Sequence, residues 1–195
     1  MDKTKIFFTA SYYGKKKYQQ YYNLVLRKIE ESDADLIGTE KGNYMEILDK
    51  RMKRKIRNER HLHYEAIRRG ILWADAVIIE NSNEDFQLGH EATLAIQAKK
   101  HVLCLSLRED FSRKIKNEYF HGAKYNEYNI GTVIRRFLQL VQKENLSERF
   151  NCFLSKRQVT YLEKKSAYEG ASRSEYLRQL LEEDMGAYDL LKCNE

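Results

Sequence analysis

The sequence has no proline, few cysteines and no long hydrophobic run. Without proline, the chain contains no proline-rich linker and its helices have no strong internal breaker. The three cysteines, Cys104, Cys152 and Cys193, are scattered and suggest neither a disulfide framework nor a CxxC metal motif. No apolar run approaches the roughly 20 residues of a membrane-spanning helix, so we expect no membrane partner. The opening residues lack the pattern of a secretory signal, and we therefore expect a cytoplasmic protein.

The basic charge of the chain is concentrated in one segment. The 195 residues include 35 Lys and Arg against 29 Asp and Glu, which gives a net charge of +6. Residues 50–69 contain nine Lys or Arg and two Glu, so this segment carries +7 and the rest of the chain carries −1. Two interpretations remain open. The segment is either a solvated helix face or a surface that contacts phosphates of a nucleic acid or nucleotide.

Two continuous apolar runs give the strongest indication of fold. Residues 76–79 and 102–105 do not alternate with polar residues, which is typical of strands buried on both faces of a parallel sheet. A helix expected over 88–100 would connect them as a right-handed βαβ unit. We therefore predict an α/β class fold with a doubly wound, mostly parallel sheet. The other expected elements are strands over 5–10, 34–38 and 124–128, and helices over 15–31, 44–70 (one or two, ended by Gly70) and 130–143.

The pattern changes after residue 145, and we predict two domains, over 1–145 and 146–195. A strand expected over 149–154 precedes helices expected over 156–168 and 172–185. Gly170 is placed to end the first helix, and Ser172 with Glu175 forms a capping box for the second. About 38 residues cannot bury an adequate core alone, so this module must dimerise or dock.

The segment RFNCFLSKRQVTYLEKKSAYEGASRSEYLRQLLEED resembles a ribbon-helix-helix DNA-binding domain of the Arc and MetJ type. The resemblance implies a homodimer whose paired strands enter the major groove of DNA, with Cys152 facing the dimer core. A dimerisation module without DNA binding is the alternative, because Phe153 stands where a polar reader is expected. The DNA-contacting residues that the resemblance implies are Arg149, Asn151, Phe153, Ser172 and Arg173.

The segments FFTASYYG and WADAVIIENSNEDFQLGHEATLAIQAKKHVLCL resemble the nucleoside 2-deoxyribosyltransferase superfamily and its nucleotide N-glycosidase relatives. The resemblance implies a deoxyribosyltransferase-like (flavodoxin-like) sheet, no cofactor, and a nucleoside or nucleotide ligand at the carboxyl ends of the strands. Glu91 occupies the position of the catalytic nucleophile, and Asp75, the Ala-Asp aspartate before the strand, is the second catalytic residue that the resemblance implies. The implied nucleotide-binding residues are Ser11, Tyr12, Gly14, Glu80 and Gly89.

Cleavage of an N-glycosidic bond explains why carboxylates matter here. One carboxylate stabilises or attacks the anomeric carbon, and a second acid protonates the leaving base. Ile67 stands where the family usually carries an Asp, so three roles for Glu91 remain open: nucleophile, ligand-binding carboxylate, or helix-terminal Glu. The spacing of His61 and His63 puts them on different helix faces, and we expect no metal site.

Together these features predict a dimeric DNA-binding regulator that joins a nucleotide-binding domain to a ribbon-helix-helix. The alternative is an active nucleoside or nucleotide N-glycosidase, or a deoxyribosyltransferase, whose C-terminal module only dimerises it.

Overall fold

A computed structural model describes residues 3–144 and 152–192. The chain divides into two compact units, over 3–147 and over 148–195 with the first two residues. Each unit is considered by itself below. Within the described ranges, no helix has the length and apolar character needed to cross a bilayer.

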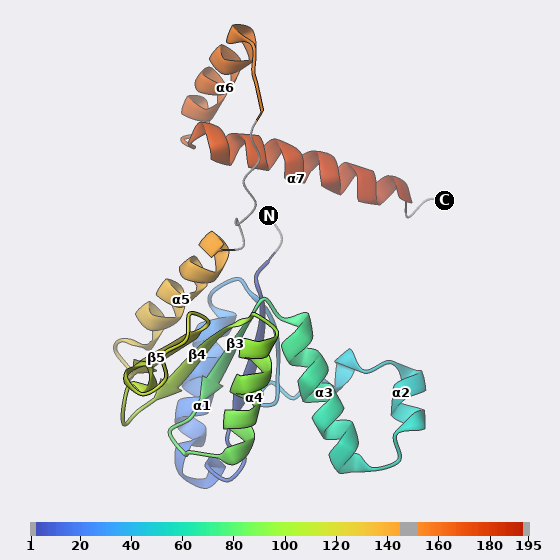
Figure 1. The fold of residues 1–195 in the computed structure, drawn as a ribbon, viewed down its shortest axis with the longest axis vertical. Coiled ribbons are helices and arrows are strands. Elements are labelled where there is room, and N and C mark those ends of the chain that lie inside the picture. Colours follow the sequence, from blue (N-terminus) through green and yellow to red (C-terminus); the bar gives the residue numbers. More distant parts are fainter. Residues whose placement is uncertain (1–2, 145–151, 193–195) are drawn as a thin grey trace. The chain divides into compact units, whose positions relative to one another are not determined.

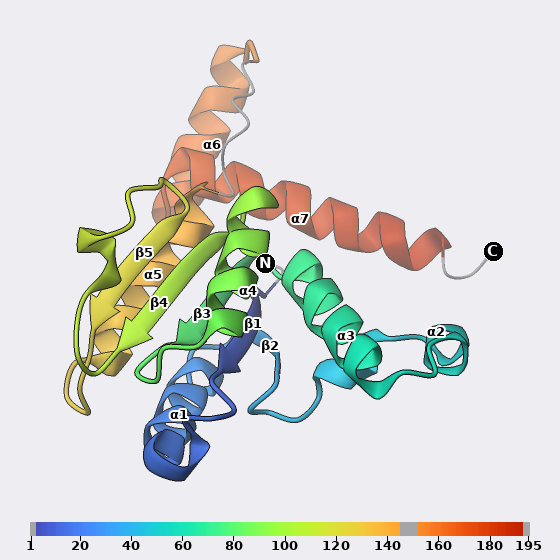
Figure 2. The same ribbon diagram turned by 60° about the horizontal axis from the view of Figure 1, so that its bottom comes forward.

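The first unit is built on five parallel strands in the order β2-β1-β3-β4-β5 (Figures 1 and 2). This order confirms the predicted α/β fold with a doubly wound parallel sheet. Because β1 lies beside both β2 and β3, the chain changes direction across the sheet between β1 and β3. The strands are β1 (Lys5–Ala10), β2 (Asp35–Gly38), β3 (Ala76–Glu80), β4 (His101–Ser106) and β5 (Phe120–Lys124).

Helices cover both faces of the sheet (Figures 1 and 2). Side chains of even number on β1 and β3, such as Phe8 and Ile78, pack with α1 and α5, whereas Phe7 and Val77 pack with α3 and α4. Every residue of β3 and β4 is buried, as their continuous apolar runs predicted. The covering helices are α1 (Lys15–Glu30), α3 (Glu59–Trp73), α4 (Phe86–Gln97) and α5 (Ile130–Glu144).

The long helical segment predicted over 44–70 is divided into three pieces. They are a 3-10 turn (Tyr44–Ile47), the short helix α2 (Lys50–Lys55) and α3. The prediction that Gly70 ends the helix was wrong, because α3 continues to Trp73. A Cβ atom on Gly70 would lie only 2.3 Å from the Phe7 ring, so this glycine permits close contact between α3 and the sheet.

Other element boundaries also differ from the prediction. The last strand covers Phe120–Lys124 instead of 124–128, and Tyr125 follows it as a buried side chain. Helix α4 begins at Phe86, two residues earlier than predicted, because the Asp85 side chain accepts a hydrogen bond from the Gln87 amide and caps the helix.

The second unit contains α6 (Lys156–Tyr168) and α7 (Arg173–Lys192). Gly170 separates them at a φ of +67°, and Ser172 and Glu175 form the predicted capping box. Helix α7 extends seven residues beyond the predicted end. Residues 152–154 do not form the predicted strand, and residues 149–151 lie outside the described ranges. A ribbon strand obtains its hydrogen bonds from a second strand, and the described residues of a single chain supply none there.

Candidate functional site

A cavity of about 350 Å³ opens where β1 and β2 end and α4 begins. Strand β1 and its following loop contribute Thr9, Ser11 and Tyr12, and the first turn of α4 contributes Gln87. This location matches the crevice at the carboxyl ends of strands, beside the change of direction between β1 and β3, where doubly wound proteins bind ligands. The remaining lining residues are Ala10, Tyr13, Lys15, Thr39, Glu40, Tyr44, His63, Asp85 and Leu88.

Glu91 lies behind the wall of this cavity. Its carboxyl is buried in the second turn of α4 and accepts a 2.8 Å hydrogen bond from the Gln87 side chain through Oε1. Within the described residues, Oε2 is buried and has no hydrogen-bond partner within 3.5 Å, although the Thr9 hydroxyl lies near enough to the carboxyl to affect its pKa. Burial raises the pKa of Glu91 to about 7, and the negative charge of Asp85 adds to this effect, while Gln87 and the Thr9 hydroxyl partly offset it. Glu91 therefore titrates near neutral pH.

The loop after β1 is joined to the start of α4 by side-chain hydrogen bonds. The Ser11 hydroxyl donates to Asp85 Oδ2 at 2.8 Å and accepts from Asn83 Nδ2 at 3.1 Å. Asp85 Oδ1 meanwhile accepts from the Gln87 amide and caps α4. The predicted residue Ser11 thus belongs to the cavity wall and fixes its two sides relative to each other. Tyr12 also lines the cavity, and its ring is largely exposed at the mouth.

Two polar pairs in the cavity wall were not predicted from the sequence. Lys15 Nζ lies 3.0 Å from Glu40 Oε1, whose side chain is almost fully buried. The Tyr44 hydroxyl lies 3.0 Å from His63 Nδ1, and burial lowers the pKa of this histidine, which favours its neutral form. Each pair joins residues that are 19 or more positions apart in the sequence, so local patterns gave no signal for either.

Glu80 belongs to a separate buried network on the other face of the sheet. Its carboxylate accepts hydrogen bonds from the Ser82 hydroxyl and, at 2.9 Å, from the Tyr125 hydroxyl. Burial raises the pKa of Glu80. Because Glu80 has the same parity on β3 as Ile78, it faces α1 and α5, whereas Glu91 lies on the α4 side. The structure does not bring these two predicted residues together.

Three other predicted residues lie away from the cavity wall. Asp75 precedes β3, at the opposite end of the strand from Glu80, and its Oδ2 accepts a 2.8 Å hydrogen bond from the Lys5 amide. Gly14 permits contact with Tyr22, since a Cβ atom would lie 2.1 Å from that hydroxyl. Gly89 has open space around it, and its amide donates to the Asp85 carbonyl inside α4. The amide of Gly89 is therefore occupied within the helix.

A second, larger hollow of about 560 Å³ lies at the end of β5, lined by Tyr21, Leu107 and residues 124–129. We favour the smaller cavity as the candidate site because it backs onto Glu91 and lies beside the β1–β3 change of direction. Within residues 3–144 and 152–192, no three His, Cys, Asp or Glu side chains converge as metal ligands would.

The predicted DNA-contacting residues are only partly described. Phe153 is fully exposed. The Ser172 amide donates to Glu175 at 2.7 Å, and Arg173 forms a 3.1 Å surface ion pair with Glu163. Arg149 and Asn151 lie outside the described ranges. At the start of α7, the predicted DNA-contacting residues Ser172 and Arg173 thus form a capping box and an ion pair within this chain.

The fold and the cavity define an α/β protein with a doubly wound parallel sheet and a candidate site at the carboxyl edge. Comparison of the sequence with models of known families finds no match, and comparison with curated proteins finds none either.

Proposed function

We propose that the cavity at the ends of β1 and β2 binds a nucleoside or nucleotide, and that the first unit is the ligand-sensing part of a DNA-binding regulator. The observation that carries this proposal is the buried Glu91 carboxyl, which accepts a hydrogen bond from Gln87 of the cavity wall through Oε1 and leaves Oε2 without a partner among the described residues. A cavity of about 350 Å³ is within the usual size range for small-molecule sites.

The chemistry of the wall suits the parts of a nucleotide. The exposed rings of Tyr12 and Tyr13 offer a surface on which a base can stack. Asp85 and Glu40 carry oxygens that accept hydrogen bonds from sugar hydroxyls, and Lys15 carries a cation for a phosphate. Ser11 fixes the loop after β1 to the first turn of α4, so the two sides of the site are held before a ligand arrives.

The second unit is proposed as the DNA-binding and dimerising part. Phe153, Leu154 and Leu181 are exposed in a unit that buries few large side chains, among them Leu162 and Tyr176. Such exposed apolar surface favours self-association of the kind the ribbon-helix-helix resemblance implies. In the dimer, Arg149, Asn151 and Phe153 would face the major groove, and Arg173 would exchange Glu163 for a phosphate.

A second candidate function is N-glycoside cleavage or transfer. It is favoured by the pKa of about 7 at Glu91 together with the nearby charge of Asp85. Two carboxyl groups in different environments can divide acid and base roles. One carboxylate would stabilise the anomeric carbon while the bond from carbon to base nitrogen breaks. The other acid would give the departing base its proton, and water or a second base would complete the product.

Calorimetry of the full chain against ribo- and deoxynucleosides and their monophosphates tests binding, and chromatography of the same mixtures tests base release. We expect binding without base release. Tyr12→Ala should weaken binding by about 5- to 150-fold through lost stacking, whereas Tyr128→Ala, another exposed tyrosine, should leave it unchanged.

Failure of every compound to bind would contradict the nucleotide proposal. Base release by the wild type that is lost in Glu91→Gln would establish the second candidate in its place.

A further inference from the structure

The segment between the 3-10 turn and the body of α3 forms an exposed basic arm, defined here as residues 50–60. Helix α2 lies at its tip and extends away from the sheet, beyond α3 (Figures 1 and 2). Seven of its eleven residues are Lys or Arg, and Glu59 is its one acid. All seven cations are exposed. The cations of the arm are Lys50, Arg51, Lys53, Arg54, Lys55, Arg57 and Arg60.

These cations are not neutralised by the protein. In the described part of the chain, none of the seven belongs to an ion pair. Two neighbouring acids already have partners: Asp49 caps α2 through the Met52 amide, and Glu65 forms a 3.0 Å ion pair with Arg68. The arm therefore keeps a concentrated positive charge that is available to a partner.

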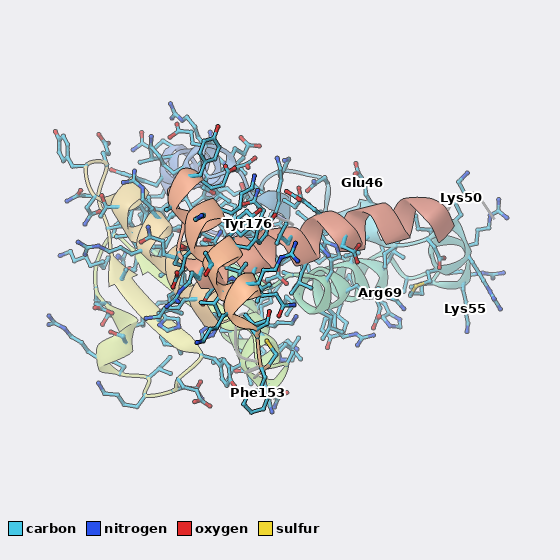
Figure 3. The ribbon with its side chains drawn as sticks, turned by 90° about the horizontal axis from the view of Figure 1, so that it is seen from above. Glu46, Lys50, Lys55, Arg69, Phe153 and Tyr176 are labelled. Carbon is cyan, nitrogen blue, oxygen red and sulfur yellow. The ribbon has the colours of Figure 1, made fainter. Side chains whose placement is uncertain are left out.

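The cations of α2 share one side of the helix. At about 100° per residue, its five Lys and Arg side chains fall within an arc of about 200°, and Met52 points to the opposite side. Met52 is half-buried, and with Ile56 it lines a shallow hollow against the start of α3. Figure 3 shows Lys50 and Lys55 projecting outward from α2. The helix thus presents a cationic surface with a small apolar attachment behind it.

The chemistry of the arm distinguishes among anionic partners. A bilayer would require a larger apolar face than Met52 and Ile56 provide. The one amide side chain of the arm, Asn58, accepts the His61 amide hydrogen at 3.0 Å through Oδ1, so it is not free for a bidentate contact with adenine. The dense cations of the arm match the regular phosphates of a duplex, which carries one charge per roughly 1.7 Å.

We propose that the basic arm binds the sugar–phosphate backbone of duplex DNA without preference for base sequence. This goes beyond the proposed function, because it puts a DNA contact on the α/β unit and not only on the C-terminal unit. The contact depends on the arm's cations alone, so it remains if the ribbon-helix-helix proposal fails.

The test is fluorescence anisotropy of the full chain with labelled 30-base-pair duplexes of unrelated sequences, from 50 to 200 mM salt. The arm variant is Lys53→Gln/Arg54→Gln/Lys55→Gln, since glutamine retains helix propensity while removing charge. The matched control is Arg113→Gln/Lys116→Gln/Arg135→Gln, which removes three exposed cations elsewhere on the unit. Circular dichroism and thermal unfolding confirm that both variants fold. Arg173→Ala reports on the C-terminal unit separately.

We expect the arm variant to bind every duplex at least tenfold more weakly at 50 mM salt. Its plot of log affinity against log salt should flatten by about two to three units, at ~0.9 per lost phosphate contact. The control should match the wild type. Equal binding by arm variant and control would overturn the proposal, as would a wild type that prefers phosphatidylserine vesicles to duplex. Loss of affinity only in Arg173→Ala would overturn the arm proposal while supporting the proposed function.

Discussion

Gln87 donates a 2.8 Å hydrogen bond to Glu91, one turn further along α4. This pair connects a residue of the cavity wall with a carboxyl that is buried behind the wall. A ligand that reorients Gln87 would therefore change the hydrogen bonding of a group that titrates near pH 7. Binding of such a ligand would be coupled to the ionisation of Glu91.

The pKa of Glu91 predicts how stability depends on pH. The unfolded chain loses this proton near pH 4.5, whereas the folded protein keeps it until about pH 7. Between these values the folded state binds more protons, so the free energy of unfolding falls as pH rises. This difference in pKa corresponds to about 3 kcal/mol of unfolding free energy. Denaturant unfolding at pH 4.5 and pH 7.5 should therefore show the wild type losing about 3 kcal/mol more than Glu91→Gln.

A matched control for this experiment is Glu84→Gln, an exposed residue of the preceding loop. It should follow the wild type at both pH values. If Glu91→Gln also follows the wild type, Glu91 does not titrate between these pH values as a buried carboxyl.

Substitution of two helical glycines by alanine should change the unfolding free energy in opposite directions. Gly70→Ala would place a Cβ atom 2.3 Å from the Phe7 ring, so we expect a loss of about 1–3 kcal/mol from overpacking. Gly89→Ala meets open space on α4, and we expect a gain of about 0.5–1 kcal/mol from helix propensity. Urea unfolding of both variants measures the difference, and equal effects would show that Gly70 is not needed for close packing.

Asp85 should stabilise the fold more through the hydrogen bonds it accepts than through its negative charge. Asp85→Ala removes the cap of α4 and the partner of Ser11, and we expect unfolding free energy to fall by about 1–2 kcal/mol. Asp85→Asn retains an acceptor for the cap, so its unfolding free energy should fall by only a few tenths of a kcal/mol. Thermal unfolding of the two variants compares these effects. A loss in Asp85→Asn as large as in Asp85→Ala would assign the effect to the charge.

Continuous apolar runs, capping residues and helical periodicity predicted most elements of the fold. Those signals are local, and they succeeded for β3, β4 and the Ser172 capping box. Gly70 was misread because its role depends on Phe7, which is 63 positions away in the sequence. Only three-dimensional packing reveals such a contact.

The candidate site shows the same limit. The sequence pointed to Glu91, Ser11 and Tyr12. In the structure Ser11 and Tyr12 line the cavity, and Glu91 accepts a hydrogen bond from Gln87 of its wall. The sequence could not show that Glu80 and Glu91 lie on opposite faces of the sheet, because this depends on the register of β3 and on the start of α4.

Dimerisation through residues 149–154 remains a prediction. Cys152 is exposed in the single chain and lies outside the α/β unit, so Cys152→Asp should leave that unit folded, but in a paired ribbon it would bury an unpaired charge. Sedimentation velocity should show the wild type and Cys152→Ser as dimers and Cys152→Asp as a monomer. A stable Cys152→Asp dimer would contradict the ribbon.

The proposal that this protein senses a nucleotide and binds DNA is tested most directly by one comparison. The affinity of the wild type for duplex DNA is measured with and without a saturating nucleoside monophosphate. The tightest binder among the eight common ribo- and deoxynucleoside monophosphates serves as the probe. Linkage between the two sites predicts a change in DNA affinity of about 5- to 150-fold, and an equal change in nucleotide affinity when DNA is present. An unchanged DNA affinity with the nucleotide bound would contradict the account.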